Sequence, residues 1–320
     1  MADLGRVVVL AGGFSHEREV SQRSGRRVAD ALIDIGVEAE VRDVDASLLP
    51  SLRASRPDAV FPLLHGSAGE DGSLRDVLEV LDLPYVGARP DACRRAFAKP
   101  VAKGTLRASG VATPAGVALP HEMFRELGAA TLLDAIVAKF GLPLFVKPTE
   151  GGSSLGAAVV RDAAELPSAM VRCFAYGSTA LVEQFVEGTE VAVSVVDTGD
   201  GPRALPPVEV VADDHVYDYA ARYTAGRTEF FCPARLDEAV TATVERTALV
   251  AHERLGLRDL SRTDLIVDRE GLPWFLEVNV APGMTETSLL PQSVTATGMD
   301  LGVVCRDLLQ AAAARGSART

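Results

Sequence analysis

The stretch EVNVAPGMTETSLLP, residues 277–291, is the most informative part of this sequence. It continues an apolar run, WFL, so the chain enters it as a strand. Glu277 and Asn279 stand two positions apart, and such residues in a strand point to the same side. Pro282 and Gly283 then predict a turn. The strand therefore presents a carboxylate and a carboxamide on one face, directly before the chain turns away.

A third oxygen donor, Asp264, lies on the preceding strand. The segments SRTDLIVD (261–268) and PWFLEVNV (273–280) are joined by REGL, which predicts a hairpin that brings Asp264 across to the same side. Three oxygen donors without a thiolate or an imidazole suit a hard cation, magnesium or manganese. The alternative is a solvated face on an edge strand, and spacing alone does not separate the two.

Lys147 ends an apolar strand, LPLFVK, and precedes the glycine-rich segment GGSSLG. A lysine followed by glycines and hydroxyls is typical of a phosphate site, in which the ammonium binds the phosphate from one side and backbone N–H groups bind it from the other. The sequence contains neither GxxxxGK[ST] nor GxGxxG, which excludes a Walker loop and a dinucleotide loop. Lys99 can add a second cation from a neighbouring helix. The alternative is an ordinary glycine hairpin with solvated lysines.

Two further segments carry candidate ligands. EQFVEGTE (183–190) places Glu183 at a strand end and Glu190 seven residues on. Backbone groups between such carboxylates can bind adenine, and a carboxylate can bind ribose; the alternative is a charged edge at a domain crossing. His65 follows a buried strand, at the edge of an α/β sheet where ligands bind. Its alternative is a hydrogen-bonded structural histidine.

The composition limits the class of protein. With 320 residues, we expect two or three small lobes around a cleft. A net charge of −12 argues against nucleic acid or an anionic membrane as a partner. The four cysteines form no pair at CxxC spacing, which favours reduced thiols in the cytoplasm. No secretory signal and no apolar run long enough to span a membrane is evident.

The order of predicted elements indicates an α/β fold of three lobes. Residues 1–88 alternate strands and helices, which predicts a parallel sheet with helices on both faces and PYVGA (84–88) as a short strand. Residues 89–186 form a central lobe that begins with a helical segment in which Pro100 is a kink or restart. Residues 187–320 form a C-terminal lobe.

These signals are individually weak, but their order along the chain is specific. The sequence resembles D-alanine–D-alanine ligases of the ATP-grasp superfamily over nearly its whole length. The resemblance rests on AGGFSHEREVS (11–21), LHGSAGEDGSL (64–74), FVKPTEGGSSLG (145–156), LVEQFVEGTEVAV (181–193), YDYAARY (217–223), TEFFCPA (228–234), SRTDLIVD (261–268) and FLEVNVAPGMTETSLLP (275–291).

The resemblance implies an ATP-dependent ligase that makes D-alanyl-D-alanine for peptidoglycan precursors. Such enzymes phosphorylate the carboxylate of one D-alanine, and the amine of a second then attacks the acyl phosphate. The implied cofactors are ATP and two Mg²⁺ (or Mn²⁺) ions, and a cytoplasmic homodimer is implied as well. In this interpretation the first lobe binds substrate, the central and C-terminal lobes sandwich ATP, and the last also holds the metals and second substrate.

The same resemblance assigns nucleotide and metal roles. It implies phosphate binding by Lys99 and Lys147, an adenine-binding edge at Glu183, Gln184 and Val186, ribose binding by Glu190, a phosphate contact from Arg222, and metal ligation by Asp264, Glu277 and Asn279. For the amino-acid substrates it implies Glu17 at the first ammonium, His65 beside the first substrate, Gly283 near the tetrahedral intermediate, Ser288 and Leu289 at the second carboxylate, and Arg262 on the transferred phosphoryl group and oxyanion.

Ser153 and Tyr223 match a pair that, with Glu17, links the lobes and the loop over the site. In related ligases a tyrosine at the position of Tyr223 accompanies amide products, and a phenylalanine accompanies esters of D-lactate. The resemblance therefore implies a peptide ligase.

Several positions depart from the family pattern. They are Arg75 for glutamine, Ala98 for aspartate, Glu150 and Gly151 for Arg-Glu, Arg222 for lysine and Thr287 for histidine. None removes a metal ligand or a phosphate lysine, although several cluster near the amino-acid sites or the lid. Two alternatives therefore stay open: a ligase that joins other small amino acids in a specialised or self-resistance pathway, and a catalytically dead fold retained for binding.

Overall fold

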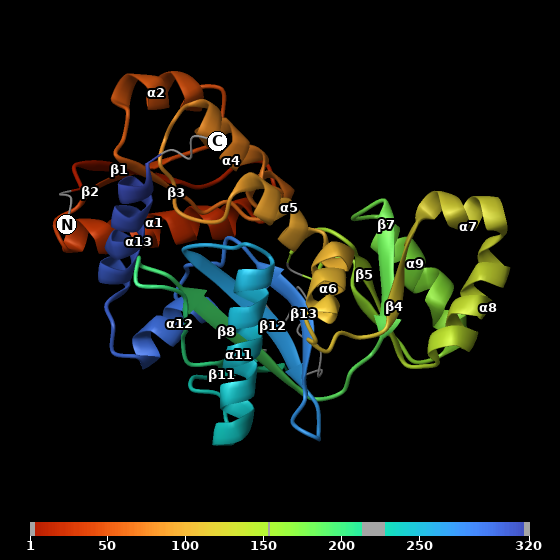
Figure 1. Ribbon diagram of the computed structural model, residues 1–320. Helices are drawn as coiled ribbons and strands as arrows, with labels where there is room; N and C mark the ends of the chain where they lie inside the picture. The colour runs from red at the N-terminus through yellow and green to blue at the C-terminus, as the bar shows by residue number, and fades with distance from the viewer. Residues whose placement is uncertain (1–3, 153, 213–227, 317–320) are drawn as a thin grey trace.

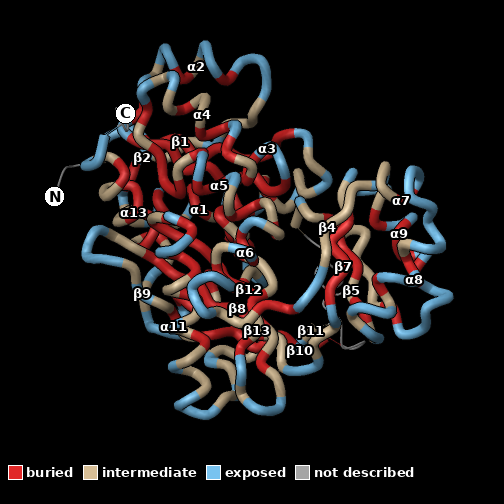
Figure 2. The backbone as a smooth tube through the Cα atoms, turned by 45° about the vertical axis from the view of Figure 1, so that its right-hand side comes forward, coloured by how far each residue is buried: buried red, intermediate tan, exposed pale blue. Residues whose placement is uncertain are grey.

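The computed structural model describes residues 4–152, 154–212 and 228–316, and this part of the chain contains three β-sheets. Figure 1 shows the N-terminal lobe above the C-terminal lobe, with the central lobe set apart to one side. Figure 2 shows a buried centre in each of these parts. The predicted α/β class with a parallel N-terminal sheet is what the structure contains.

The N-terminal lobe is a parallel sheet of strand order β2-β1-β3. Its elements are β1 (Arg6–Leu10), α1 (Arg18–Asp34), β2 (Glu38–Arg42), α2 (Leu48–Ser55), β3 (Ala59–Pro62), α3 (Ser67–Glu70) and α4 (Ser73–Val80). Alternate residues of β1 point to opposite faces. Val7 and Val9 pack with α1, whereas Val8 and Leu10 pack with α2 and α4. Helices therefore cover both faces, as predicted.

The predicted strand at PYVGA is reduced to a single bridge between Tyr85 and Val60. Pro84 has no N–H to donate to a neighbouring strand. The N–H of Gly87 donates instead to the Asp259 carboxylate, at 2.7 Å. Strand pairing therefore ends after one residue.

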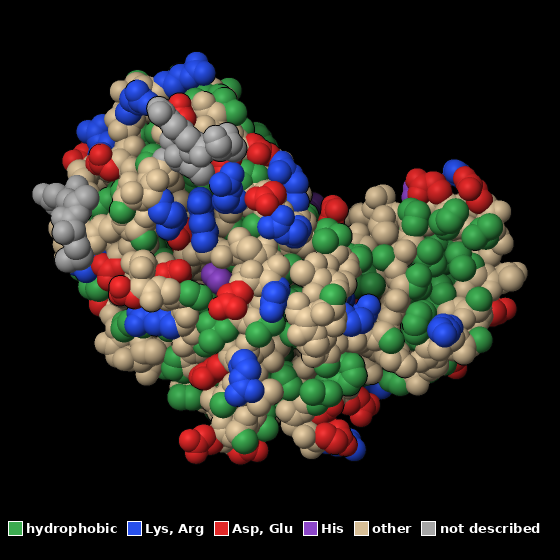
Figure 3. Space-filling view, in the orientation of Figure 1, with side chains coloured by type: hydrophobic (Ala, Val, Ile, Leu, Met, Phe, Trp, Pro, Cys, Tyr) green, Lys and Arg blue, Asp and Glu red, His purple; other side chains and the backbone are tan. Residues whose placement is uncertain are grey.

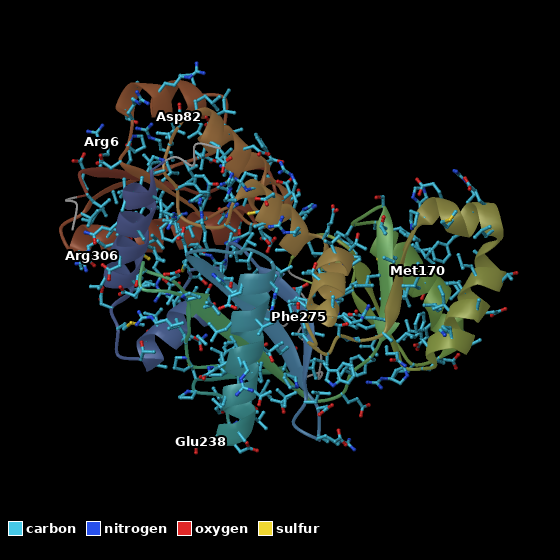
Figure 4. All side chains as sticks on the ribbon, in the orientation of Figure 1. Arg6, Asp82, Met170, Glu238, Phe275 and Arg306 are labelled. Atoms are coloured by element: carbon cyan, nitrogen blue, oxygen red, sulfur yellow. The ribbon has the colours of Figure 1, made fainter. Side chains whose placement is uncertain are left out.

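The central lobe is an antiparallel sheet of order β4-β7-β5-β6. Its elements are β4 (Gly116–Pro120), α7 (His121–Leu127), α8 (Ala129–Phe140), β5 (Leu144–Pro148), β6 (Ala158–Val160), the 3-10 turn Ala163–Glu165, α9 (Leu166–Phe174) and β7 (Thr179–Gln184). Leu144 and Val146 pack with Met170 of α9, labelled in Figure 4, in one core. The alternation of β5 then turns Phe145 and Lys147 to the other face.

The C-terminal sheet has the order β11-β10-β8-β12-β13, with β9 paired to β8. Its elements are β8 (Thr189–Val196), β9 (Arg203–Ala204), β10 (Val208–Ala212), β11 (Thr228–Phe231), α11 (Glu238–Arg254), β12 (Leu260–Val267), β13 (Pro273–Asn279), α12 (Leu289–Ala296) and α13 (Leu301–Arg315). Helix α11 packs on one face of this sheet. The predicted hairpin of β12 and β13 is antiparallel.

Core packing divides the chain differently from the boundaries drawn on the sequence. The helical segment after residue 88 forms two helices, α5 (Pro90–Phe97) and α6 (Lys99–Ala108), with a restart at Pro100. Both pack in one buried cluster with β8, β12 and β13, so residues 90–108 belong by contact to the C-terminal lobe. Helix α13 packs against α1 and β3 of the N-terminal lobe. These helices pack where they do because each buries its apolar side chains against the nearest uncovered face of a sheet.

Candidate active site

Two neighbouring cavities lie between the lobes. The larger, of about 620 Å³, is lined by predicted nucleotide and metal residues: Lys99, Lys147, Glu183, Gln184, Val186, Glu190, Asp264 and Glu277. The smaller, of about 90 Å³, is lined by predicted substrate and metal residues: Glu17, His65, Arg262, Asn279, Gly283, Ser288 and Leu289. Gly152 lines both. Figure 3 shows the surface deeply indented between the N-terminal and central lobes.

The remaining predicted site residues, Ser153, Arg222 and Tyr223, lie outside the described residues. Their assigned roles stay predictions.

The hairpin of β12 and β13 places the polar ligands through a β-bulge. Asp264 pairs with Glu277 and Leu265 pairs with Phe275, so Leu276 is the extra residue. Phe275 packs in the core, and the bulge then turns Glu277 to the opposite face. Without the bulge, Phe275 and Glu277 would share a side. The hairpin thus directs its carboxylates toward the cavities and its apolar side chains toward α6 and α11.

β13 is an edge strand of its sheet, but the polar face of this hairpin is largely buried, which contradicts the alternative of a solvated face. Arg262 donates to both oxygens of Asp264, at 2.7 and 2.8 Å. Asn279 donates its amide to the same carboxylate at 3.2 Å. The side chains of Arg262 and Asp264 are only 10% and 8% exposed. Asp264 is therefore held by charge-assisted hydrogen bonds at the junction of the two cavities.

Lys99 and Lys147 reach the larger cavity from different lobes. Lys99 lies 3.2 Å from Glu277 and donates to the carbonyl of Gly151 at 2.6 Å, so it fixes the start of the glycine-rich segment. Gly151 has φ +103°, a conformation that L side chains rarely adopt. Lys147 projects from β5 into the cavity and lies 2.9 Å from Glu183.

Glu183 is a buried carboxylate shared by two lysines. One oxygen lies 2.9 Å from Lys147 and the other 2.8 Å from Lys103. Burial would raise the pKa of Glu183, but the two lysines hold it below its usual value. Burial would likewise lower the pKa of Lys147, and Glu183 raises it above the usual range. The carboxylate of Glu183 thus contacts two lysines. Adenine binding at this position stays a prediction.

Sequence reasoning missed Lys103. The signal was present, because Lys103 stands four residues after Lys99 and the two share one face of a helix.

His65 lies in the smaller cavity as a neutral imidazole. Its Nδ1 is 3.1 Å from the carbonyl of Ala281, so Nδ1 carries the proton and donates. Burial lowers the pKa of His65, which keeps the ring uncharged. Its Nε2 is buried and has no hydrogen-bond partner among the described residues. Nε2 can therefore accept a hydrogen bond from a ligand in this cavity, which Glu17 and Arg262 also line.

Helix α1 holds the two loops that complete the smaller cavity. Ser21 accepts from Gly12 and donates to the Leu63 carbonyl, both at 2.8 Å, which holds the loop that leads to Glu17. Ser24 accepts from the N–H of Met284 at 3.0 Å, which holds the loop after β13.

The loop after β13 presents Ser288 at the N-terminus of α12. The Ser288 hydroxyl lies 2.9 Å from the Thr285 hydroxyl and accepts from the Thr285 N–H at 2.9 Å. A Cβ at position 283 would meet the Ser288 oxygen at 2.7 Å. Gly283 is therefore needed for this approach, which supports its place beside Ser288 but leaves its predicted role untested.

Comparison with known proteins identifies the family. A model described as "D-ala D-ala ligase C-terminus" matches residues 106–310, and one described as "D-ala D-ala ligase N-terminus" matches residues 42–88. A D-alanine–D-alanine ligase of Anaeromyxobacter dehalogenans is 41% identical over 308 residues, which are 96% of this chain and 97% of that protein. One of Bordetella petrii is 38% identical over 98% and 93% of the two chains. The chain belongs to the D-alanine–D-alanine ligase family.

Comparison with solved structures leads to the same family and fold. A D-alanine–D-alanine ligase from Bacillus anthracis matches with a TM-score of 0.82 and 29% identity, over 96% of this chain and 97% of that one. The VanG D-Ala:D-Ser ligase from Enterococcus faecalis matches with a TM-score of 0.81 over 97% and 100% of the two chains. At 24% identity the latter likeness concerns the fold alone. The predicted family and the ATP-grasp fold class are confirmed.

The donor set of this ligase fits a magnesium or manganese site. No three acidic, histidine or cysteine side chains gather as a metal cluster in the described ranges. The predicted set consists of two carboxylates and an amide, Asp264, Glu277 and Asn279. Such oxygen donors are the ligands of hard cations. Asp264 contacts the guanidinium of Arg262, and Glu277 contacts the ammonium of Lys99. The two carboxylates therefore already stabilise positive charge at this place. Metal ligation stays a prediction.

Sequence reasoning also missed Glu70 of this ligase. Its carboxyl lines the smaller cavity, is 6% exposed and accepts from the N–H of Gly66 at 3.0 Å. Burial raises its pKa to about 8, and the charge of Glu17 adds to the rise. Glu70 is thus protonated at neutral pH. The motif LHGSAGEDGSL contains it, but only the fold shows that it is buried.

The raised pKa of Glu70 predicts a pH-dependent gain in stability for Glu70→Gln. In the unfolded chain this carboxyl ionises near 4.5, whereas in the folded chain it stays protonated to about pH 8. The contribution of Glu70 to folding stability is therefore fully present below pH 4.5 and is lost as pH rises towards 8. Glutamine cannot ionise, so it carries no free-energy cost for keeping a buried carboxyl protonated. We expect Glu70→Gln to be the more stable protein at pH 8, by on the order of 2 kcal/mol.

Thermal melts at pH 5 and pH 8 measure this effect. The advantage of Glu70→Gln over wild type must grow between the two values. Glu270→Gln removes an exposed carboxylate and serves as control. An equal difference at both pH values would contradict a buried, protonated Glu70.

Among residues 4–152, 154–212 and 228–316, no helix combines the length and apolarity needed to cross a membrane.

Proposed function

We propose that the chain joins two D-alanine molecules into D-alanyl-D-alanine with ATP, in peptidoglycan precursor synthesis. The observation that carries this proposal is the position of the β12–β13 hairpin. Asp264 and Glu277 line the larger cavity, whereas Arg262 and Asn279 line the smaller one. A nucleotide in the first and an amino acid in the second would meet at this hairpin. That is the arrangement needed to transfer phosphate from ATP to a carboxylate.

In the first step a carboxylate oxygen of D-alanine attacks the γ-phosphorus, and ADP leaves. We assign Lys99 and Lys147 to the nucleotide phosphates, because both are cations on the wall of the larger cavity. Asp264, Glu277 and Asn279 would hold two magnesium or manganese ions, which neutralise phosphate charge when bound. Arg262 lies beside these ligands and can stabilise the transferred phosphoryl group.

In the second step the amine of the second D-alanine attacks the acyl carbon, a C–N bond forms, the nitrogen loses a proton, and phosphate leaves. The N-terminus of α12, which begins at Leu289, offers N–H groups to the second carboxylate, and Ser288 can offer its hydroxyl. Glu17 would bind the first ammonium. The neutral His65 offers an acceptor at Nε2 to the same group. Arg262 can then neutralise the tetrahedral oxyanion.

A specialised ligase is the second candidate. Thr287 lines the smaller cavity where a histidine is usual, and it is exposed beside the Thr285 and Ser288 hydroxyls. The change lies beside the second substrate, so it bears on which amine is accepted.

A phosphate-release screen over D- and L-amino acids, singly and in pairs, tests both candidates when product masses are also measured. We expect release with D-alanine alone and the mass of D-alanyl-D-alanine. Faster release with another pair would favour the specialised ligase, and ATP binding without turnover would favour a dead fold. D-Lactate supplied with D-alanine tests the predicted amide preference, which an abundant ester would overturn. We include a cytoplasmic homodimer in the proposal, as the resemblance implies.

A further inference from the structure

Lysine is rare in this chain, and most of its lysines lie in one place. The 32 basic residues include four lysines, so the other 28 are arginines. Lys139 is exposed on α8, whereas Lys99, Lys103 and Lys147 are only 5%, 3% and 7% exposed. A lysine ammonium is a compact point charge, whereas guanidinium is a broad planar fork. The use of lysine at these three positions indicates a need for compact buried cations.

Lys103 differs from the other two because it does not line the larger cavity. It lies behind the wall, on α6, where it contacts the carboxylate of Glu183 at 2.8 Å. It also donates to the carbonyl of Phe275 at 3.1 Å. Figure 4 labels Phe275 next to α6. Lys103 thus connects β7 of the central lobe to β13, the strand that carries the predicted metal ligands.

The charges of this cluster explain why a second lysine is present. Glu183 contacts Lys147 at 2.9 Å, and alone it would cancel much of the charge that Lys147 offers to the cavity. In a buried site such cancellation is strong, because screening by water is weak. With Lys103 on the other oxygen, two cations share one anion and a single positive charge remains.

We propose that Lys103 is a positioning residue for ATP: it balances Glu183 from behind the wall, so that Lys147 presents positive charge to the phosphates. The inference rests on the proposed function, which assigns phosphate to Lys147. Burial lowers the pKa of Lys103 to about 8, partly opposed by Glu183, so Lys103 is charged at neutral pH.

The test compares the binding of adenosine, ADP and ATP by calorimetry at pH 7 with magnesium present. We expect Lys103→Met to weaken ATP binding at least about tenfold and adenosine binding less than about twofold, with ADP between them, because the loss concerns charge. The double variant Glu183→Gln with Lys103→Met leaves Lys147 as the single uncompensated charge, as in wild type, so it should bind ATP within about threefold of wild type. Lys139→Met is the matched surface control.

Lys103→Gln replaces the methionine variant if the latter does not fold, because glutamine keeps a donor for the Phe275 carbonyl and removes only the charge. Equal losses for adenosine and ATP would overturn the inference and indicate a structural role. So would a double variant, Glu183→Gln with Lys103→Met, that binds ATP as weakly as Lys103→Met alone. If Lys147→Met weakens ATP and Lys103→Met does not, the inference alone fails. If neither does, the proposed phosphate site fails with it.

Discussion

Glu277→Gln is expected to lower turnover about 10²- to 10³-fold, the range typical for removing a group that stabilises transition-state charge. Glu277 faces the larger cavity opposite Asp264 and lies 3.2 Å from Lys99. Glutamine keeps the shape but removes the negative charge. A bound metal ion would lose an anionic ligand while it faces several phosphate charges.

The measurement is ADP formation with D-alanine over a range of magnesium concentrations. The control is Glu270→Gln, which removes an exposed carboxylate in the turn of the same hairpin and should keep wild-type activity. Because Glu277 is predicted to bind metal, the deficit should shrink as magnesium is raised. Near-native turnover at low magnesium would remove Glu277 from the metal site.

Lys147→Met is expected to lower kcat/KM for ATP about 10²- to 10³-fold, with a raised KM. The ammonium of Lys147 is buried in the wall of the larger cavity, where a charge interacts more strongly than in water. Its removal also leaves Glu183 paired with Lys103 alone, so that the cluster is neutral.

Steady-state kinetics with varied ATP measure this loss, and circular dichroism checks that the variant is folded. Lys139→Met removes the exposed lysine of α8 and should leave kcat/KM unchanged. Adenosine should bind to Lys147→Met nearly as well as to wild type. Retention of wild-type KM for ATP by Lys147→Met would place the phosphates elsewhere.

Every predicted site residue that the structure describes lines one of the two cavities, because the chemistry of these residues is encoded in short segments. Lys147 ends an apolar strand before glycines, and strand alternation alone directs it away from the core. Ser288 follows a Pro–Gly turn and begins a helix. Such features depend on neighbours within a few residues, and local geometry then determines where the side chain points.

Long-range packing was not predictable in the same way. Helices α5 and α6 follow the N-terminal lobe in the chain, yet they cover the C-terminal sheet. Their amphipathic pattern shows that one face is buried but does not name the sheet that buries it. The same holds for α13 on the N-terminal lobe.

By itself, the sequence determined which oxygen donors and cations are candidates for the site, with the exception of Lys103 and Glu70, because residue type sets the chemistry. Only the tertiary structure decided how they meet. The bulge at Leu276 turns Glu277 toward Asp264, although simple alternation would place Glu277 with the buried Phe275. Pairing between strands creates a bulge, so no single strand shows it. Likewise, Lys103 acquires its place because α6 packs beside both β7 and β13, where Glu183 is the anion within reach.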